Sequence, residues 1–363
     1  MNRSGATLRV LESVPLAPYT TLGIGGPARF MVCAKTEAHV LDALQFARAR
    51  GCPVFVLGGG SNILVSDSGF PGLVIKIEIQ GIENADAAVS GRLSAAAGVE
   101  WDAFVQRCVA LNLAGVECLS GIPGTVGASP VQSIAAYGED IREVLTQIRA
   151  LDRNSLQLVE FSNADCRFAY RTSIFNTTRR DRFVILRVDF ALRPNGPPCL
   201  LYPDLKQRFV ESKQPPGICE VRDAVLDIRR AKSMVLSEND PDSKSAGSFF
   251  KNPVLDQESF SVLEGRARAA GLLRDSESIP FFRTGPTHKK VPAAWLIEHA
   301  GFVKGYAHKN AGISGKHALA LINRGGATAQ DILELMHLIQ DRVQKAFGVE
   351  LLPEPLFVGF GME

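Results

Sequence analysis

The segment AGSFFKNP, residues 246–253, combines residue types that could support a proton transfer. Ser248 offers a small hydroxyl group beside Gly247, and Phe249 and Phe250 follow it directly. Such a hydroxyl can approach a reacting carbon closely, while two large apolar rings can fix the strand that carries it. A serine hydroxyl is a weak acid, so it donates a proton only to a strongly basic carbanion or with help from a neighbour. The alternative is a structural serine in a tightly packed strand.

Two glycine-rich segments have the residue types of phosphate-binding loops. LGGGSNIL (57–64) offers consecutive backbone N–H groups without side chains in front of them, followed by Ser61 and Asn62 as polar contacts. The longer segment LSGIPGTVGASPVQSIAAYG (119–138) repeats this pattern. Two such loops in one domain could cradle a pyrophosphate through main-chain N–H groups. Each loop read alone could equally be a tight turn.

The familiar nucleotide, metal and hydrolase motifs do not fit. GIGGPA (23–28) matches the dinucleotide fingerprint only in part, because no apolar strand precedes it and Pro27 removes a backbone N–H group. GISGKH (312–317) lacks the first glycine of a P-loop and has His317 in place of serine or threonine. The six histidines show no paired ligand spacing, and GxSxG is absent. We therefore predict neither a metal site nor a hydrolase nucleophile.

Hydrophobic periodicity and capping residues predict the elements that would position these segments. Thr36 and Gly51 have the residue types that begin and end a helix, and Thr328 and Gly348 frame a longer one. Four prolines and a glycine within 192–205 favour a domain linker there. We expect helices over 36–51, 101–115 and 328–348, and strands beginning at Pro53 and over 72–79, 182–192 and 349–360.

The composition indicates an ordinary globular protein of two or three domains. The 363 residues include 46% hydrophobic and 21% charged residues, with a formal net charge of +2. This balance gives no broad cationic surface, so we expect no nucleic-acid partner. Seven cysteines without a CxxC pair suit a reduced compartment. No segment has the pattern of a secretory signal or a membrane span, so we expect a cytoplasmic protein without membrane insertion.

Seven segments occur in the order found in one known family. They are TTLGIGGPA, LGGGSNIL, GIPGTVGASPVQSIAAYG, CRFAYRTSIF, AGSFFKNP, AAWLIEHAG and GVELLPEPLFVG. Through these segments, from about Tyr19 to Gly359, the chain resembles the UDP-N-acetylenolpyruvoylglucosamine reductases (UDP-N-acetylmuramate dehydrogenases, MurB), flavoenzymes of bacterial peptidoglycan precursor synthesis. ASPVQSIAAYG and LLYPDL resemble the type of this family in which a tyrosine loop, here carrying Tyr202, covers the substrate.

The resemblance implies an α+β fold with two main parts. A two-lobed FAD-binding domain of the vanillyl-alcohol oxidase (PCMH) type is expected over 1–195, with the lobes divided near residue 72. A linker that carries the tyrosine loop is expected over 196–207. An α+β substrate-binding domain is expected over 208–363, and it would end with a returning C-terminal strand.

The resemblance also implies non-covalent FAD as cofactor and NADPH as the co-substrate that reduces it. The two glycine loops would hold FAD, with residues near the N-terminus beside them. The cofactor-binding residues expected on this basis are Tyr19, Thr21, Gly23, Gly25, Gly58, Gly59, Gly60, Ser61, Asn62, Gly121, Pro123, Gly124, Gly127, Ser129 and Pro130.

The implied reaction is the reduction of UDP-N-acetylglucosamine enolpyruvate to UDP-N-acetylmuramate. Hydride from reduced FAD would reach the vinyl carbon, charge would develop toward the substrate carboxylate, and Ser248 would protonate the carbon that bears this carboxylate. Arg171 would hold the aci-enolate with its charged, forked guanidinium. Glu354 would be the second stabiliser, as a protonated carboxyl whose pKa is raised by apolar surroundings. Read alone, Arg171 would be a surface ion pair and Glu354 a solvated loop residue.

Four further residues are expected at the substrate. Tyr202 would close over the diphosphate as a lid, and Lys232 would pair with the phosphates of the substrate or of the nicotinamide cofactor. Tyr170 and Asn252 would also contact the substrate. Lys232 read alone would belong to a solvated helix end. We expect a monomer that acts on a small molecule.

The chain departs from the family pattern at three places. Ser133 and Ala135 stand where this type usually has asparagine and glycine, and Pro203 follows the loop tyrosine in place of glycine. Pro355 and Leu356 replace a usual valine and arginine. These changes concern FAD contact, loop motion and site geometry, and none of them removes a catalytic group.

Two other functions remain open at this point. An oxidase on the same FAD scaffold would use oxygen in place of NADPH. Such enzymes often tether their flavin through a histidine or cysteine, and His39 is the one histidine of the expected FAD domain. A non-catalytic nucleotide-sugar binder would have no need of Ser248, Arg171 and Glu354.

Overall fold

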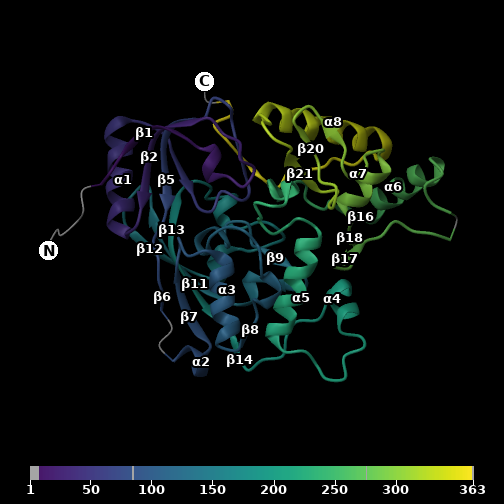
Figure 1. Cartoon of the computed structure of the whole chain (residues 1–363), viewed down its shortest axis with the longest axis horizontal. Coiled ribbons are helices and arrows are strands. Elements are labelled where there is room, and N and C mark those ends of the chain that lie inside the picture. The colour runs from purple at the N-terminus through teal and green to yellow at the C-terminus, as the bar shows by residue number, and fades with distance from the viewer. Residues whose placement is uncertain (1–7, 84–85, 275, 362–363) are drawn as a thin grey trace. The chain divides into compact units, whose positions relative to one another are not determined.

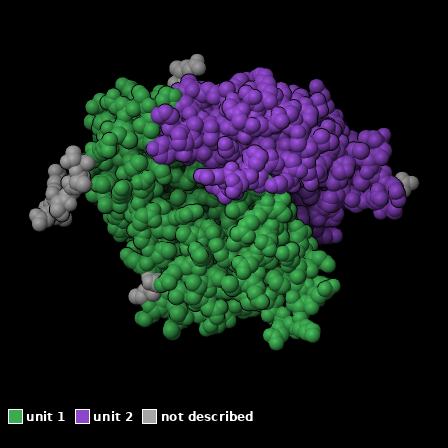
Figure 2. Space-filling view, viewed as in Figure 1, with its two compact units in different colours: residues 1–14, 27–60, 70–235 green, residues 15–26, 61–69, 236–363 purple. Residues whose placement is uncertain are grey.

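The computed structural model describes residues 8–83, 86–274 and 276–361. Two compact units make up the chain, and Figure 2 shows them in green and purple. Two short segments of the N-terminal third belong to the same unit as the C-terminal third. Unit 1 contains residues 1–14, 27–60 and 70–235, and unit 2 contains residues 15–26, 61–69 and 236–363.

The first sheet of unit 1 leads into the first glycine loop. Its strand order is β1-β2-β5-β3, and β5 pairs in parallel with both β2 and β3. Helix α1 lies beside this sheet (Figure 1). The helix begins after Thr36, which accepts a backbone N–H, and ends at Gly51 with a φ of 60°, as predicted. The strands are Leu11–Pro15 (β1), Pro27–Ala34 (β2), Phe70–Ile77 (β5) and Val54–Leu57 (β3), and the helix is Glu37–Arg50 (α1).

The second sheet of unit 1 is antiparallel, with strand order β12-β11-β13-β7-β6. Buried rings of α3 pack on it, and the ring centroids of Phe104 and Phe190 are 4.5 Å apart. Helix α3 ends before Asn112, which has a left-handed φ of 54°, so the predicted end at Gly115 is wrong. The strands are Leu158–Ser162 (β12), Leu145–Asp152 (β11), Phe183–Ala191 (β13), Arg92–Ala96 (β7) and Ile82–Glu83 (β6), and the helix is Trp101–Ala110 (α3).

Two helices of unit 1 follow the second sheet and the tyrosine segment. Helix α4 (Pro203–Arg208) begins directly after Tyr202 and lies beside α5 (Ile218–Ala231; Figure 1). A small apolar cluster joins the two helices, and its buried members are Cys118, Leu205, Val221, Ala224 and Val225. Short elements of this unit are α2 (Ala87–Ser90), β8 (Leu113–Ala114), β9 (Ala135–Ala136), β10 (Glu139–Asp140) and β14 (Arg193–Pro194).

Unit 2 is built around a sheet that carries Ser248. The strand order of this sheet is β15-β21-β20-β19, and a second sheet has the order β16-β18-β17, with antiparallel pairs throughout. Helices α6, α7 and α8 bury their apolar faces in the core of this unit. The bounds are Ser245–Ser248 (β15), Ala320–Asn323 (β21), Ala311–Ile313 (β20), Ala307–His308 (β19), Val254–Asp256 (β16), His288–Lys290 (β18), Phe282–Thr284 (β17), Gln257–Ala269 (α6), Ala293–His299 (α7) and Ala329–Phe347 (α8).

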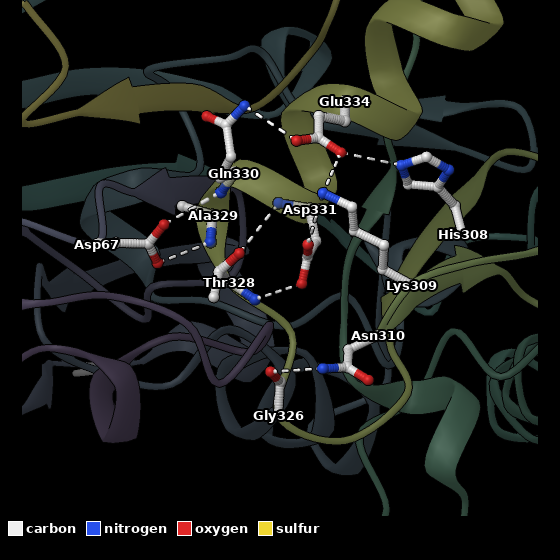
Figure 3. A network of polar contacts seen from close by, with 10 residues as sticks. All are labelled: Asp67, His308, Lys309, Asn310, Gly326, Thr328, Ala329, Gln330, Asp331 and Glu334. Carbon is white, nitrogen blue, oxygen red and sulfur yellow. Dashed lines mark hydrogen bonds and ion pairs between the residues drawn. The ribbon is translucent and has the colours of Figure 1, made fainter.

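Helix α8 begins after Thr328 and ends at Gly348, as predicted. The carboxylate of Asp67 accepts two further hydrogen bonds at the start of the helix, from the N–H of Ala329 at 2.8 Å and of Gln330 at 3.1 Å (Figure 3). A carboxylate is favourable there because the first N–H groups of a helix have no partner within the helix. The segment that follows the first glycine loop is thereby fixed to α8 within unit 2.

The C-terminal strand returns to this same segment. Strand β22 (Leu356–Val358) pairs in parallel with β4 (Ile63–Val65). The strand predicted over 349–360 is shorter than expected, because Pro353 and Pro355 cannot donate backbone hydrogen bonds. The returning strand explains why residues 61–69 belong to unit 2.

The division of the chain differs from the expected domain boundaries. The expected linker, 196–207, lies inside unit 1, and the division falls at 235–236. Residue 72, where we expected the lobes to divide, lies within β5 of the first sheet. The proline-rich composition was a poor guide, because Pro203 begins a helix, where proline is tolerated, and Leu205 is buried.

The predicted α+β class is confirmed. Antiparallel sheets dominate both units, and among the described residues parallel pairs occur in the first sheet of unit 1 and between β22 and β4. In the part of the chain that the structure describes, none of the helices has the length and apolarity that crossing a membrane requires.

Candidate active site

Ser248 is the last residue of β15 and lies on a strand with little freedom to move. It is opposite Ala320 of β21, and the N–H of Phe249 donates to the carbonyl of Leu319 at 2.8 Å. Phe249 and Phe250 are 0% and 1% exposed, and their ring centroids are 5.5 Å apart. The two phenylalanines therefore hold the strand from the core, as predicted.

A histidine that the sequence did not single out lies against Ser248. The Nε2 atom of His317 is 3.2 Å from the Oγ atom of Ser248, a hydrogen-bond distance. The backbone N–H of His317 donates to Ser314 Oγ, which in turn donates to the carboxylate of Asp242. Sixty-nine positions separate the serine from the histidine. Only the pairing of β15 with β21 brings them together, so no local motif could have signalled the contact.

Glu354 lies beside the strand of Ser248 within unit 2. Its backbone N–H donates to the carbonyl of Phe249 at 2.8 Å. On its other side, the N–H of Leu356 donates to the carbonyl of Asn62 at 3.0 Å, and Asn62 Nδ2 donates to the carbonyl of Glu354 at 3.4 Å. The backbone that carries Glu354 is thus bonded both to the Ser248 strand and to the end of the first glycine loop.

Thr21 belongs to the same group of residues. Its hydroxyl donates to the carbonyl of Ser245, at the start of β15, at 2.6 Å, and lies 3.4 Å from the carbonyl of Ser61. Tyr19 is the last residue of a short 3-10 helix, Ala17–Tyr19, in the same segment. Unit 2 therefore brings Thr21 and the Ser61–Asn62 pair next to the strand that carries Ser248.

Gly23 and Gly25 have backbone angles that favour glycine. Their φ values are 65° and 145°, and a Cβ atom on Gly25 would lie 2.9 Å from the Cβ of Val65. Both glycines are therefore needed for the path of the chain beside β4. A role of either glycine at FAD stays a prediction.

The two predicted glycine loops touch each other in unit 1. A Cβ atom on Gly59 would lie 2.5 Å from the Cα of Gly124, and one on Gly58 would lie 2.9 Å from Thr125 Oγ1. Only residues without a side chain permit this approach. Within the described residues, the N–H groups of Gly59, Gly60 and Gly124 donate to no acceptor. The loops thus present main-chain donors of the kind that bind phosphate oxygens.

The second loop is fixed at Gly121 by α3 and α5. The N–H of Gly121 donates to Asp102 at 2.6 Å, and the guanidinium of Arg222 donates two hydrogen bonds of 2.7 Å to the same carboxylate. Burial of Asp102 opposes its ionisation, but the hydrogen bonds from Arg222 and Gly121 outweigh burial and hold the pKa of Asp102 below its ordinary value. The carboxylate stays charged and locks the start of the loop.

The remainder of the second loop packs inside unit 1. A Cβ atom on Gly127 would lie 2.5 Å from the Cβ of Ala97. Ser129 is buried and donates to the carbonyl of Val126 at 2.7 Å, and Pro130 is buried beside it. These contacts explain the residue types by packing, and contact of these residues with FAD stays a prediction.

Arg171 lies in a tight turn of unit 1. The residues on either side of the Tyr170–Arg171 pair exchange two backbone hydrogen bonds of 3.0 Å, and Arg171 has a φ of 56°. This angle is uncommon outside glycine and is often found at functional sites. The guanidinium carbon lies 5.8 Å from the ring centroid of Tyr170. Ser173 Oγ donates to the carbonyl of Val131 at 2.7 Å, which joins this turn to the second glycine-rich segment.

Ser133 shows the physical consequence of one departure from the family pattern. Its φ is 47°, and the side chain is 1% exposed. Among the described residues, its Oγ atom has no hydrogen-bond partner. Asparagine tolerates the left-handed region better and reaches further than serine. The serine therefore carries a conformational cost at this position.

Tyr202 and Lys232 both lie in unit 1, at the α4–α5 pair. The ring of Tyr202 meets the ring of Tyr137 edge to face, with centroids 5.1 Å apart. Lys232 follows α5, and its Nζ atom is 3.2 Å from Oδ2 of Asp204. Asn252 lies in unit 2, where its Oδ1 atom accepts the N–H of the first residue of α7 at 2.9 Å. That oxygen has a structural role, and substrate contact by Asn252 stays a prediction.

One buried group in unit 1 has the residue types of a metal site. Ligand atoms of Glu117, Cys118 and Glu139 lie within 4.8 Å of one another. Backbone N–H groups of Gly115, Cys199 and Cys118 already donate to three of the four carboxylate oxygens. Burial, together with the neighbouring charge of Glu117, raises the pKa of Glu139 to about 9. The protonated form of Glu139 is therefore favoured in the folded state.

Each unit therefore brings together part of the predicted site. Unit 2 joins Thr21, Asn62, Ser248 and Glu354, with His317 as an addition. Unit 1 joins the two glycine loops, links the Arg171 turn to the second of them, and holds the Tyr202 segment at α5.

Two family models match successive parts of the chain. Residues 28–159 match a model described as an FAD binding domain. Residues 240–358 match the C-terminal domain of UDP-N-acetylenolpyruvoylglucosamine reductase. An FAD-binding domain joined to a reductase domain defines the class of the protein, an FAD-binding oxidoreductase.

Relatives along the whole length specify the family. The chain is 45% identical to UDP-N-acetylenolpyruvoylglucosamine reductase of Thermobifida fusca, over 97% of this chain and 99% of that protein. It is 42% identical to the enzyme of Streptomyces coelicolor, over 99% of this chain and 93% of that protein. The chain belongs to the family of UDP-N-acetylenolpyruvoylglucosamine reductases, as the motifs predicted.

A solved structure shows that the fold is shared as well. The crystal structure of UDP-N-acetylenolpyruvylglucosamine reductase from Thermus caldophilus matches with a TM-score of 0.64 at 24% identity. The match covers 97% of this chain and 98% of that one. The expected fold, an FAD-binding domain followed by an α+β domain, is confirmed.

Proposed function

We propose that this chain reduces UDP-N-acetylglucosamine enolpyruvate to UDP-N-acetylmuramate, with NADPH as the source of electrons and FAD as the carrier. The observation that carries the proposal is the Ser248 hydroxyl, which lies on a rigid strand with His317 at 3.2 Å and the Glu354 backbone bonded alongside. Family membership supplies the reaction class. The product serves peptidoglycan precursor synthesis, as in the family.

FAD fits the residues of the glycine loops. The close approach of Gly59 to Gly124 would be blocked by any side chain, and backbone N–H donors remain at both loops. Such donors suit the pyrophosphate of FAD. Thr21, Ser61 and Asn62 are proposed to complete the cofactor contacts. When bound, the reduced flavin supplies a hydride to the vinyl carbon of the substrate.

Ser248 is proposed to give its hydroxyl proton to the carbon that bears the substrate carboxylate. Addition of hydride leaves an electron pair on this carbon and its carboxylate, and the pair takes up the proton. The geometry supplies the neighbour that a weakly acidic serine needs. His317 Nε2 can orient the hydroxyl and return a proton to it after the transfer.

Arg171 and Glu354 are proposed to stabilise the charge that develops on the substrate carboxylate. A guanidinium can donate two parallel hydrogen bonds to a carboxylate, and it stays charged throughout the reaction. The uncommon φ of 56° at Arg171 is a conformation that the surrounding turn must hold. Glu354 would act as a protonated carboxyl that donates a hydrogen bond to the enolate.

Tyr202 and Lys232 are proposed to bind the diphosphate of the substrate. Tyr202 precedes α4 and Lys232 follows α5, which packs beside α4. Tyr170 would contact the substrate beside Arg171. We also propose that the enzyme is a monomer of the cytoplasm, with small molecules as its partners and without nucleic-acid binding or membrane insertion.

Separate half-reactions test this function. The purified protein should be yellow, and acid denaturation should release FAD, because neither glycine loop offers an obvious tethering residue. Under anaerobic conditions NADPH should reduce the flavin, and UDP-N-acetylglucosamine enolpyruvate should reoxidise it with formation of UDP-N-acetylmuramate. A flavin that only oxygen reoxidises would indicate an oxidase. No NADPH oxidation in the presence of substrate would indicate a non-catalytic nucleotide-sugar binder, and a colourless protein that FAD cannot reconstitute would overturn the proposal as a whole.

A further inference from the structure

An ion pair engages the lysine that we assign to the substrate diphosphate. The Nζ atom of Lys232 lies 3.2 Å from Oδ2 of Asp204. Asp204 is the second residue of α4 and follows Tyr202 by two positions. Both side chains are partly exposed, at 35% for Lys232 and 49% for Asp204. The carboxylate of Asp204, in the proposed lid, thus contacts the ammonium group of Lys232 that we assign to phosphate binding.

A second cation lies in the same neighbourhood. Burial raises the pKa of Tyr137, while the charges of Arg229 and Lys232 lower it, so both cations act on this phenol. Arg229 is 6% exposed and donates to the carbonyl of Met234 at 2.8 Å. The buried arginine is fixed, whereas the ammonium of Lys232 is reachable from solvent. Of the two cations Arg229 and Lys232, Lys232 is therefore the one that can release one anion and bind another.

Helix α4 is held weakly enough to give way. Leu205 is its one buried side chain among the described residues. A second ion pair, from Arg208 to Asp227 of α5 at 2.9 Å, is about half exposed. Exposed ion pairs contribute little to stability. A hollow of about 660 Å³ is lined by Pro203, Asp204, Gln207, Arg208 and Ile228. The face of α4 is therefore not fully packed.

We propose that Asp204 competes with the substrate for Lys232, so that a nucleoside diphosphate must displace this carboxylate before it can bind. The inference rests on the proposed function, in which Lys232 binds the diphosphate. A diphosphate carries more negative charge and more acceptor oxygens than one carboxylate, so the exchange favours the ligand. Release of Asp204 also frees the first turn of α4, and with it Tyr202, to close on the bound anion. Asp204 thereby links the lid to occupation of the site.

The test measures binding of UDP to the FAD-loaded enzyme by titration calorimetry. Asp204→Asn should lower the Kd of UDP about 2- to 5-fold at low ionic strength, the range of an exposed ion pair. The gain should shrink as salt is added, because exposed charges are screened. Asp227→Asn is the matched control, since it removes the same charge and breaks the ion pairs of Asp227 with Arg208 and Arg230 but leaves Lys232 engaged. Its Kd should stay at the wild-type value.

Lys232→Gln separates this inference from the function on which it rests. If Lys232→Gln binds UDP as tightly as wild type, the diphosphate role of Lys232 fails, and the competition fails with it. If binding weakens, the role stands, and adding Asp204→Asn to Lys232→Gln should change the Kd no further. A gain that persists without Lys232, or an equal gain in Asp227→Asn, would show that Asp204 acts through general charge or through the first turn of α4. Either result, or an unchanged Kd in Asp204→Asn, overturns the competition.

Discussion

The segment around Ser248 and the segment around Tyr202 are held in opposite ways. Ser248 lies on a strand with backbone hydrogen bonds, and the next two side chains are completely buried. Tyr202 precedes a helix of six residues with one buried side chain and two exposed ion pairs. The proposed proton donor is thus fixed within the core of its unit, while the proposed lid rests on contacts that cost little to break.

This difference matches what each group would have to do. A proton donor loses rate when it moves by a fraction of an ångström, so its strand must be rigid. A lid must open and close in each turnover, so its contacts must be weak. On the proposed function, the Ser248 segment would serve the chemical step and the Tyr202 segment would serve substrate binding. Variants in the first segment should then slow the reaction, and variants in the second should weaken substrate binding.

Ser248→Ala should cause the largest change in rate. Reoxidation of the flavin by the enolpyruvyl substrate should slow by about 10²–10⁴-fold, as for a lost general acid. Reduction of the flavin by NADPH needs no proton from Ser248 and should stay near the wild-type rate. Stopped-flow absorbance follows both steps separately.

Ser248→Cys is the control for this result, because a thiol can donate a proton from nearly the same place. It should recover part of the reoxidation rate. If Ser248→Ala reoxidises within a few-fold of wild type, the proton comes from water or from Glu354, and AGSFFKNP is only a well-packed strand.

Phe249→Ala tests the rigidity of the same strand. The ring is 0% exposed, so its removal should lower the free energy of unfolding by about 3–5 kcal/mol. Phe209→Ala, in the half-buried position that follows α4, should cost about 1 kcal/mol. Urea unfolding followed by circular dichroism measures both. Equal losses would mean that the two segments are packed alike, and the comparison between them would fail.

Local signals in the sequence predicted the ends of helices better than they predicted the boundary between the two units. Thr36, Gly51, Thr328 and Gly348 were identified correctly as helix ends, because a cap depends on the residues next to it. The glycine loops were also identified locally, and their contact through Gly59 follows from the space that a side chain would need.

Contacts between distant segments could not be predicted in this way. The hydrogen bond from Ser248 to His317 exists only because β15 pairs with β21. Residues 61–69 belong to unit 2 because β22 returns to β4, and no composition signal marks that return. Proline content placed a boundary at 192–205, where the structure has buried packing instead.

The buried carboxyl pair should make stability fall as pH rises. The unfolded pKa of Glu139 is near 4.5 and the folded pKa is about 9, so between these values the folded state holds a proton that the unfolded state lacks. The stabilisation is complete below pH 4.5 and is lost as pH rises toward 9, by up to about 1.4 kcal/mol per pH unit. Glu139→Gln should remove this slope in thermal melts. A slope that remains would mean that Glu139 is not the group responsible for it.

Glu334 of unit 2 is the matched control with the opposite sign. Hydrogen bonds from Lys309 first, then from His308 and Gln330, lower the pKa of this carboxylate to about 2 (Figure 3). The folded state therefore holds fewer protons than the unfolded state between pH 4.5 and 2. The stabilisation is present above pH 4.5 and is lost as pH falls toward 2. Glu334→Gln should therefore lower the melting temperature above pH 4.5, and its difference from wild type should shrink as pH falls toward 2.

Tyr202→Phe should have the smallest effect and tests the lid most directly. The change removes one hydroxyl and keeps the ring that packs on Tyr137, so stability should not change. A hydrogen bond to the diphosphate contributes about 0.5–1.5 kcal/mol, so the substrate should bind roughly 2- to 10-fold more weakly.

Flavin reduction by NADPH should be unaffected in Tyr202→Phe, because a lid tyrosine meets the diphosphate only when substrate is bound. Tyr137→Phe removes the hydroxyl of the ring beneath and should leave substrate affinity near wild type. Equal losses in both half-reactions of Tyr202→Phe would make the tyrosine a structural residue. The Tyr202 segment would then not be a displaceable lid. It would be as rigid as the Ser248 strand, and the difference between the two segments would disappear.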